Sequence, residues 1–186
     1  MTADLERVVG TAADMLAKVS PEQLDAATPC ASWQVRDVIN HVVNGSHLFA
    51  VIAETGEPPQ EEGEDVASGD FTATYAAESK RMIAAFNADG AMDKMMNFGF
   101  AKMPGAAAVN IVMTDTFTHV WDLARAIGEP SDLDPELAAK LLDHAKGAIP
   151  DAFRGEDGKA AFGAIVDVPA SAPAADQLAG FLGRQV

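Results

Sequence analysis

The sequence predicts an all-α protein, built as an antiparallel bundle of four helices with extra helices at the C-terminal end. Apolar residues recur at three- and four-residue steps over four long segments, strand-like alternation is sparse, and no internal repeat is visible. The 186 residues suit one domain, and 48% of them are hydrophobic, which is enough for a core. We expect a single domain over 1–186, with residues 130–186 packed on the bundle as an appendage.

The first two helices are predicted over residues 2–19 and from residues 32–34 to about residue 54. Ser20 and Pro21 end the first helix, because a proline disfavours helical geometry in the residue before it. Apolar residues of the second segment fall on one helical face. Ser32 is the better candidate for its N-cap, since its hydroxyl can accept a hydrogen bond from a first-turn amide.

A loop, a third helix and a connection follow. Residues 54–70 are rich in acids, glycine and proline, a composition that predicts a solvated loop. The third helix is predicted over residues 71–88. Residues 89–105 form a connection rich in methionine and phenylalanine, which either packs beneath a loop or lines a pliable apolar pocket.

The remaining helices are predicted from their end signals as well as from periodicity. The fourth runs over residues 106–127 and ends at Gly128, a residue typical of helix C-caps. The fifth, over 134–148, begins after Asp134, which can cap it. A short last helix is expected over residues 174–183.

Charge and composition exclude several classes of function. The formal net charge of −15 repels phosphate backbones and anionic lipid surfaces, so we expect no nucleic-acid partner and no membrane partner. The sequence has neither a signal-like N-terminus nor an apolar run long enough to span a bilayer. Cys30 is the only cysteine, which fits a reducing compartment. We therefore expect a cytoplasmic protein, and a homodimer is compatible with these properties.

The candidate chemistry lies in the fourth helix. Asp115 and His119 are four residues apart and therefore share one helical face, with Asp122 on the same stripe. A carboxylate and an imidazole so spaced can reach one metal ion, as in other helical metal sites. His41, within the apolar face of the second helix, could supply a third ligand. The spacing alone is also typical of an ordinary hydrogen-bonded pair, so both interpretations stay open at this point.

Two motifs then resemble a known family. One comprises Thr28-Pro29-Cys30, Trp33 and the run Val35-Arg36-Asp37-Val38-Ile39-Asn40-His41; the other is Asp115 followed four residues later by His119-Val120-Trp121-Asp122-Leu123-Ala124. Together they resemble the signatures of the mycothiol-dependent maleylpyruvate isomerase N-terminal-like family, within the wider DinB-like metal-binding bundles. Residues 168–184 resemble the end of a small actinobacterial metal-binding subfamily.

This resemblance implies a DinB-like four-helix bundle that holds one divalent ion through His41, Asp115 and His119. Zinc is the first candidate for the ion, with nickel or iron as alternatives, because imidazole and carboxylate ligands suit all three. The isomerase has glutamate at the acid position, whereas Asp115 has a shorter side chain.

The resemblance also implies a reaction class. A small thiol such as mycothiol would be activated at the ion, and the protein would act as a transferase or isomerase on a small electrophile. Asp122 and Arg125 are candidates for orienting the ligands or for taking part in catalysis; alternatively, the two form an ion pair that fixes the helix end. A non-catalytic metal-binding or metal-sensing protein is the alternative function.

Overall fold

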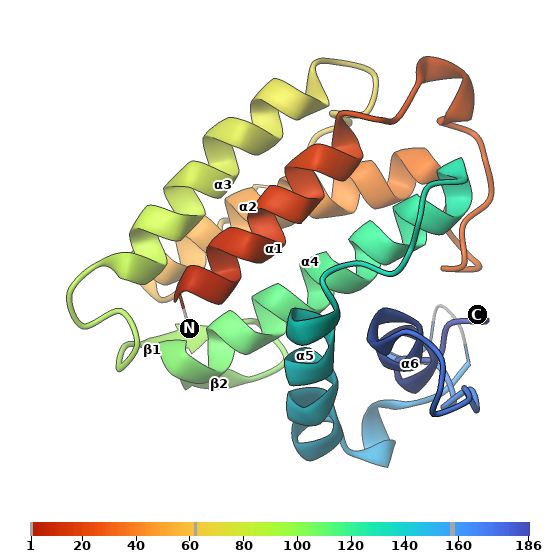
Figure 1. The fold of residues 1–186 in the computed structure, drawn as a ribbon. Helices are drawn as coiled ribbons and strands as arrows, with labels where there is room; N and C mark the ends of the chain where they lie inside the picture. The colour runs from red at the N-terminus through yellow and green to blue at the C-terminus, as the bar shows by residue number, and fades with distance from the viewer. Residues whose placement is uncertain (1, 62, 157–158) are drawn as a thin grey trace.

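The computed structural model describes residues 2–61, 63–156 and 159–186 and is all-α apart from one small hairpin (Figure 1). The α-helices are α1 (Thr2–Leu16), α2 (Val35–Thr55), α3 (Phe71–Asn87), α4 (Gly105–Ile127), α5 (Pro135–Ala148) and α6 (Ala174–Phe181). Single 3₁₀ turns lie at Pro21–Gln23 and Asp151–Phe153. Within the described part of the chain, none of the helices has both the length and the apolar character needed to cross a bilayer.

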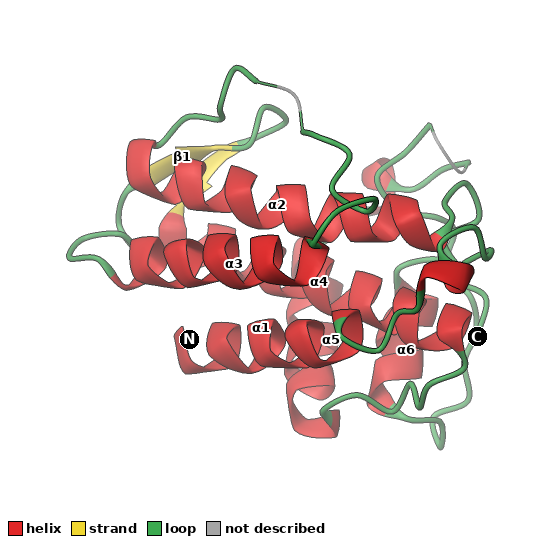
Figure 2. Ribbon diagram, turned by 90° about the horizontal axis from the view of Figure 1, so that it is seen from above, coloured by secondary structure: helices red, strands yellow, loops and turns green. Residues whose placement is uncertain are grey.

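Helices α1 to α4 form the predicted bundle. Both α1 and α2 pack on α3 and on α4, so α1 and α2 occupy diagonal corners of a four-cornered arrangement (Figures 1 and 2). Helices α5 and α6 pack on each other, and each of them also contacts α4. The predicted fold class, an all-α bundle with extra C-terminal helices, is therefore confirmed.

Two predicted helix ends have the expected geometry. Gly128 follows α4 in the left-handed conformation, with φ of 77°, which glycine adopts at little cost. The Asp134 carboxylate accepts a hydrogen bond from the Leu137 amide at 3.2 Å, so it caps α5 as expected. These two caps fix the direction in which the chain leaves the bundle.

The predicted N-cap of α2 was wrong. Gln34, not Ser32, precedes the helix, and it is extended, with φ of −88° and ψ of 171°. An antiparallel bridge between Ala27 and Gln34 holds this residue extended, so the helix can begin only at Val35. The backbone N–H of Gln34 donates to the Asp37 carboxylate at 2.8 Å, and the Gln34 side chain makes no capping hydrogen bond.

The connection after α3 contains a hairpin that the sequence did not predict. Strands β1 (Met95–Asn97) and β2 (Lys102–Pro104) pair antiparallel, with Met96 opposite Met103. The Met96 side chain is fully buried in the core, whereas Phe100, at the turn, is 68% exposed. The connection therefore mainly packs on the bundle and presents one phenylalanine to its surroundings.

The C-terminal segment is joined to the bundle by apolar and polar contacts. One buried apolar cluster includes residues from α1 through α6. The Trp121 indole of α4 donates to the Asp176 carboxylate of α6 at 2.8 Å. Beyond α6, a Cβ on Gly183 would lie 2.5 Å from the Gly163 Cα, so these backbones can approach only because both residues are glycine. This close contact fixes the position from which Arg184 extends.

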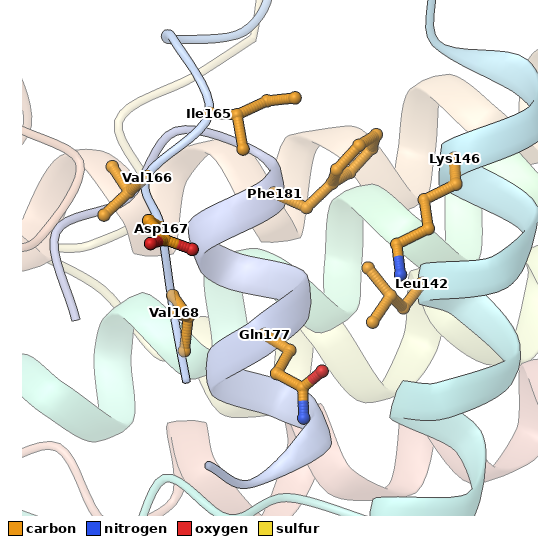
Figure 3. A pocket seen from close by; sticks show the side chains of 8 residues that line it. All are labelled: Leu142, Lys146, Ile165, Val166, Asp167, Val168, Gln177 and Phe181. Atoms are coloured by element: carbon orange, nitrogen blue, oxygen red, sulfur yellow. The ribbon is translucent and has the colours of Figure 1, made fainter. Parts of the chain in front are cut away.

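A small open groove of about 250 Å³ lies on the outer side of this segment (Figure 3). It is lined by Leu142 and Lys146 of α5, by Phe181 of α6 and by the extended residues 165–168. Ile165 is 54% exposed at its edge. The Val166 amide donates to the Gly180 carbonyl at 2.9 Å, which holds the extended residues against α6.

Candidate metal centre

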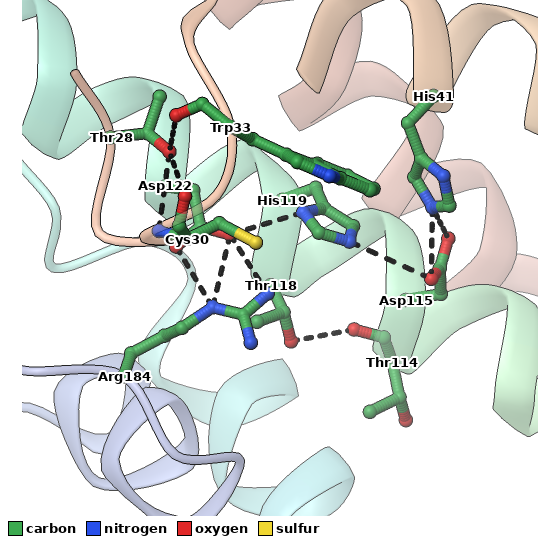
Figure 4. A network of polar contacts seen from close by, with 10 residues as sticks. All are labelled: Thr28, Cys30, Trp33, His41, Thr114, Asp115, Thr118, His119, Asp122 and Arg184. Carbon is green, nitrogen blue, oxygen red and sulfur yellow. Dashed lines mark hydrogen bonds and ion pairs between the residues drawn. The ribbon is translucent and has the colours of Figure 1, made fainter. Parts of the chain in front are cut away.

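The candidate ligands come together from helices α2 and α4 (Figure 4). His41 lies in α2, and Asp115 and His119 lie one turn apart in α4. Because the two helices pack side by side, the imidazole of α2 faces the acid–imidazole pair of α4. One ligand atom from each of the three residues lies within 4.8 Å of the others, a group that could hold a metal ion.

The interatomic distances fit a common ion. His41 Nε2 is 3.2 and 3.1 Å from the two Asp115 carboxylate oxygens, and His119 Nε2 is 3.8 Å from Asp115 Oδ1. Tetrahedral zinc with nitrogen and oxygen ligands at its usual bond lengths separates those ligand atoms by about 3.3–3.6 Å. The observed separations bracket this range. Two imidazoles and one carboxylate also leave a coordination position open, as in catalytic sites.

The orientation of His119 is set on its other side. His119 Nδ1 lies 3.0 Å from Asp122 Oδ2, so an Nδ1–H can donate to that carboxylate while Nε2 faces Asp115. Asp122 is completely buried. Arg184 balances its charge by donating from Nε and Nη2 to the same carboxylate at 3.1–3.2 Å. The hydrogen bonds from Arg184 to Asp122 and between Asp122 and His119 therefore favour the His119 tautomer with its proton on Nδ1, which leaves Nε2 free to bind a metal ion.

Trp33 covers the two histidines. Its ring lies 5.0 Å from the His119 ring, nearly parallel at 22°, and 4.8 Å from the His41 ring. The two imidazoles are themselves 4.5 Å apart, edge to face. This packing leaves the imidazoles little freedom to rotate away from Asp115, so the group is held in place before any ligand arrives.

The protonation of His41 and Asp115 is coupled. Burial lowers the pKa of His41, but the charge of Asp115 and its hydrogen bond outweigh burial, so the net shift is upward. Burial likewise raises the pKa of Asp115, but the charge and hydrogen bond of His41 outweigh it, and the net shift is downward. In the metal-free protein the charged forms of His41 and Asp115 therefore stabilise each other, and binding of a metal ion to His41 requires a deprotonated ring nitrogen.

We expect Asp115→Asn to lower the pKa of His41 in the metal-free protein from above its ordinary value of 6.5 to below it. The substitution removes the charge that raises this pKa and leaves the burial that lowers it. Because folding raises the pKa of His41, protonation of His41 stabilises the folded parent. This contribution to stability is fully present below the unfolded-state pKa and is lost as pH rises through the folded-state pKa. NMR titration of the His41 ring protons measures both values; an unchanged pKa in the variant would contradict the pairing.

A second group of possible ligands shares His119. Cys30, His119 and Asp122 also place ligand atoms within 4.8 Å of one another. Both Asp122 oxygens, however, already accept from Arg184, and a cation bound there would face the guanidinium at close range. Electrostatics therefore favours the group of His41, Asp115 and His119 as the metal site.

The fold agrees with that of known proteins. Residues 5–124 match the family model described as the mycothiol maleylpyruvate isomerase N-terminal domain. This match includes α2 and all but the last residues of α4, the two helices that carry the candidate ligands. The chain belongs to this family. The predicted family is thereby confirmed.

The chain is similar in sequence to two mycobacterial proteins and in fold to a solved enzyme structure. Two uncharacterized proteins, MT0763 and Rv0738, from two strains of Mycobacterium tuberculosis, are each 38% identical over 182 residues, covering 97% of this chain and 96% of theirs. The crystal structure of the mycothiol-dependent maleylpyruvate isomerase superposes with a TM-score of 0.59 at 15% identity, and a mutant of that enzyme gives the same values. The aligned region covers 76% of this chain but only 65% of the isomerase chain. At this identity the likeness shows the fold.

Of the two residues predicted to orient the ligands, Asp122 and Arg125, only Asp122 contacts a candidate ligand in the described part of the chain. Asp122 contacts His119, as described above. Arg125 is exposed, and its guanidinium lies 5.6 Å from the centre of the Trp121 ring. The arginine that contacts Asp122 is Arg184, which lies beyond the matched region and which the sequence did not single out. Arg184 and Asp122 are 62 residues apart in the sequence, so only the folded chain reveals their contact.

A cavity of about 400 Å³ adjoins the candidate ligands. Asp115 and His119 form part of its wall, together with residues of α4 and α5, the hairpin turn and the chain on either side of α6. Arg184 and Leu182 lie in the same wall. Most of the cavity lining thus comes from α4 and from the C-terminal segment that the family model does not include.

Proposed function

We propose that the protein binds one divalent metal ion through His41, Asp115 and His119 and uses it to activate a small thiol towards a small electrophile. The observation that carries the proposal is the convergence of these three side chains within 4.8 Å beside a cavity of about 400 Å³. Zinc is our first candidate, with nickel or iron as alternatives. Membership of a family named for a mycothiol isomerase supports a thiol such as mycothiol as the nucleophile.

The protein's own residues have separate tasks in this proposal. When bound, the ion lowers the pKa of a coordinated thiol or water and so supplies a nucleophile at neutral pH. Asp122 and Arg184 position His119, and Trp33 limits the access of water to the imidazoles. The cavity receives the electrophile within reach of Asp115 and His119.

The reaction class is thiol transfer or thiol-assisted isomerisation. In a transfer, the thiol loses its proton, its sulfur bonds to the electrophilic carbon, and the displaced electron pair departs with a leaving group or, where a double bond is opened, takes up the proton. In an isomerisation, the sulfur adds to one carbon of a double bond, the resulting single bond rotates, and the double bond re-forms as the C–S bond breaks and the thiolate is released. Because Arg184 of the C-terminal segment contacts Asp122 of α4, we propose that residues 1–186 act as one unit. We propose the cytoplasm as its compartment, because a free thiol substrate persists in a reducing environment.

The test is the absorption spectrum of the cobalt-substituted protein during titration with mycothiol, cysteine and glutathione. We expect at least one thiol to change the spectrum saturably, with a sulfur-to-cobalt band in the near ultraviolet. His41→Ala should lose this response, and His47→Ala, in the same helix but paired with Glu78, should keep it. A spectrum indifferent to every thiol would favour the alternative of a non-catalytic metal-binding or metal-sensing protein.

A further inference from the structure

The cavity beside the metal centre is mainly apolar away from the candidate ligands. Ile149, Phe153 and Phe162 line it, and two of its polar residues use their donors within α4. Asn110 donates from Nδ2 to the Ala106 carbonyl at 2.9 Å, and the Thr118 hydroxyl donates to the Thr114 carbonyl at 2.7 Å. The Thr118 hydroxyl and one Nδ2 hydrogen of Asn110 are therefore engaged before a ligand enters. Thr114, His144 and Arg184 add polar groups to a lining that is otherwise largely apolar.

Two exposed aromatic side chains belong to the same cavity. Phe100, at the hairpin turn, is 68% exposed, and Phe153, after α5, is 48% exposed. The centre of the Phe98 ring lies 6.0 Å from that of Phe100 and 5.9 Å from that of Phe49. Three aromatic rings therefore form a row from the core to the cavity. Large apolar side chains left in water beside a pocket are typical of surfaces that a ligand covers.

The charge of the protein narrows the choice of ligand. With a net charge of −15, the chain repels substrates that carry several negative charges. Arg184 is the cation in the cavity wall, and its Nε and Nη2 atoms already donate to Asp122. A neutral or nearly neutral ligand therefore fits this cavity better than a polyanion.

We propose that the cavity binds the apolar body of the electrophilic substrate, an alkyl or aryl group, with Phe100 and Phe153 as specificity-determining residues. The reacting end of that substrate would lie towards Asp115 and His119, and in this respect the inference rests on the proposed function. The volume of about 400 Å³ lies within the range typical of sites that bind small molecules.

The test uses primary alcohols from butanol to decanol, whose binding is measured by isothermal titration calorimetry to zinc-loaded protein and to protein stripped with a chelator. We expect the affinity to rise about fourfold for each added methylene until the chain fills the cavity. The same rise is expected in both preparations, because apolar burial does not need the ion. An affinity independent of chain length would overturn the inference.

Matched variants locate the binding. Phe100→Ser with Phe153→Ser should weaken octanol binding about tenfold or more, and both side chains are exposed enough for the fold to tolerate the change. Ile165→Ser is the control, since the exposure of Ile165, at 54%, lies between those of Phe153 and Phe100, but Ile165 lines the separate groove beside α5 and α6 (Figure 3). A loss confined to Ile165→Ser would place the alcohol in that groove and refute the proposal.

The two hypotheses fail separately. Protein that binds zinc but no alcohol would refute the apolar substrate and leave the metal centre standing. Protein that binds alcohols in the expected series but takes up no metal would refute the proposed function and leave the apolar cavity standing.

Discussion

His41→Ala and His119→Ala should each purify with little or no metal, whereas the parent purified without added metal should carry close to one equivalent. Each substitution removes one of the three proposed ligands. Changing a residue that merely orients a ligand already costs about 10–100-fold in affinity, so removing a ligand should cost more. Elemental analysis of the purified proteins measures the effect.

Two control variants make this prediction specific. His144→Ala removes an exposed histidine that lies in the cavity wall but outside the ligand group. Cys30→Ser tests the second possible group, which shares His119. Both variants should retain metal. Metal that survives His41→Ala but disappears in Cys30→Ser would assign the ion to Cys30, His119 and Asp122 instead.

Asp122→Asn should weaken metal binding by about 10–100-fold without abolishing it. The amide can still accept from His119 through its oxygen, but it carries no charge and presents an NH₂ group to Arg184. Arg184→Gln should have a similar effect, because it leaves a fully buried carboxylate without its cation. Competition with a chromophoric chelator gives the affinities.

The ion pair between Asp122 and Arg184 should also contribute to the free energy of unfolding. Removing one partner of a buried ion pair costs about 3–5 kcal/mol, which denaturant unfolding of the metal-free variants can measure. Arg125→Gln is the matched control, because Arg125 is exposed and should cost less than about 1 kcal/mol. Equal losses in Arg184→Gln and Arg125→Gln would show that the contact with Asp122 contributes nothing special.

The features that could be predicted from sequence are those determined locally. Helix α4 was predicted over 106–127 and found over Gly105–Ile127, because periodicity and a C-cap glycine both lie within the segment itself. The placement of Asp115 and His119 on one face follows from helical geometry alone. The pairing with His41 needed the family resemblance, since periodicity does not reveal which helices become neighbours.

The features that were missed depend on distant contacts. Arg184 lies 62 residues from Asp122 in the sequence, and a buried arginine has no local pattern that separates it from an exposed one. The strands of the hairpin are only three residues each, too short for an alternating pattern to be recognised. Ser32 was preferred as a cap on residue type, but the bridge between Ala27 and Gln34 determines where α2 begins.

The position of Trp33 has a practical consequence. The chain has two tryptophans, and Trp121 is buried at the contact with α6, away from solvent. Trp33 alone of these lies against both imidazoles, at 4.8 and 5.0 Å, so its fluorescence should respond when either ring changes charge or acquires a ligand. Trp33 fluorescence should therefore report protonation or ligand binding at His41 and His119, and the fluorescence of Trp33→Phe gives the background from Trp121.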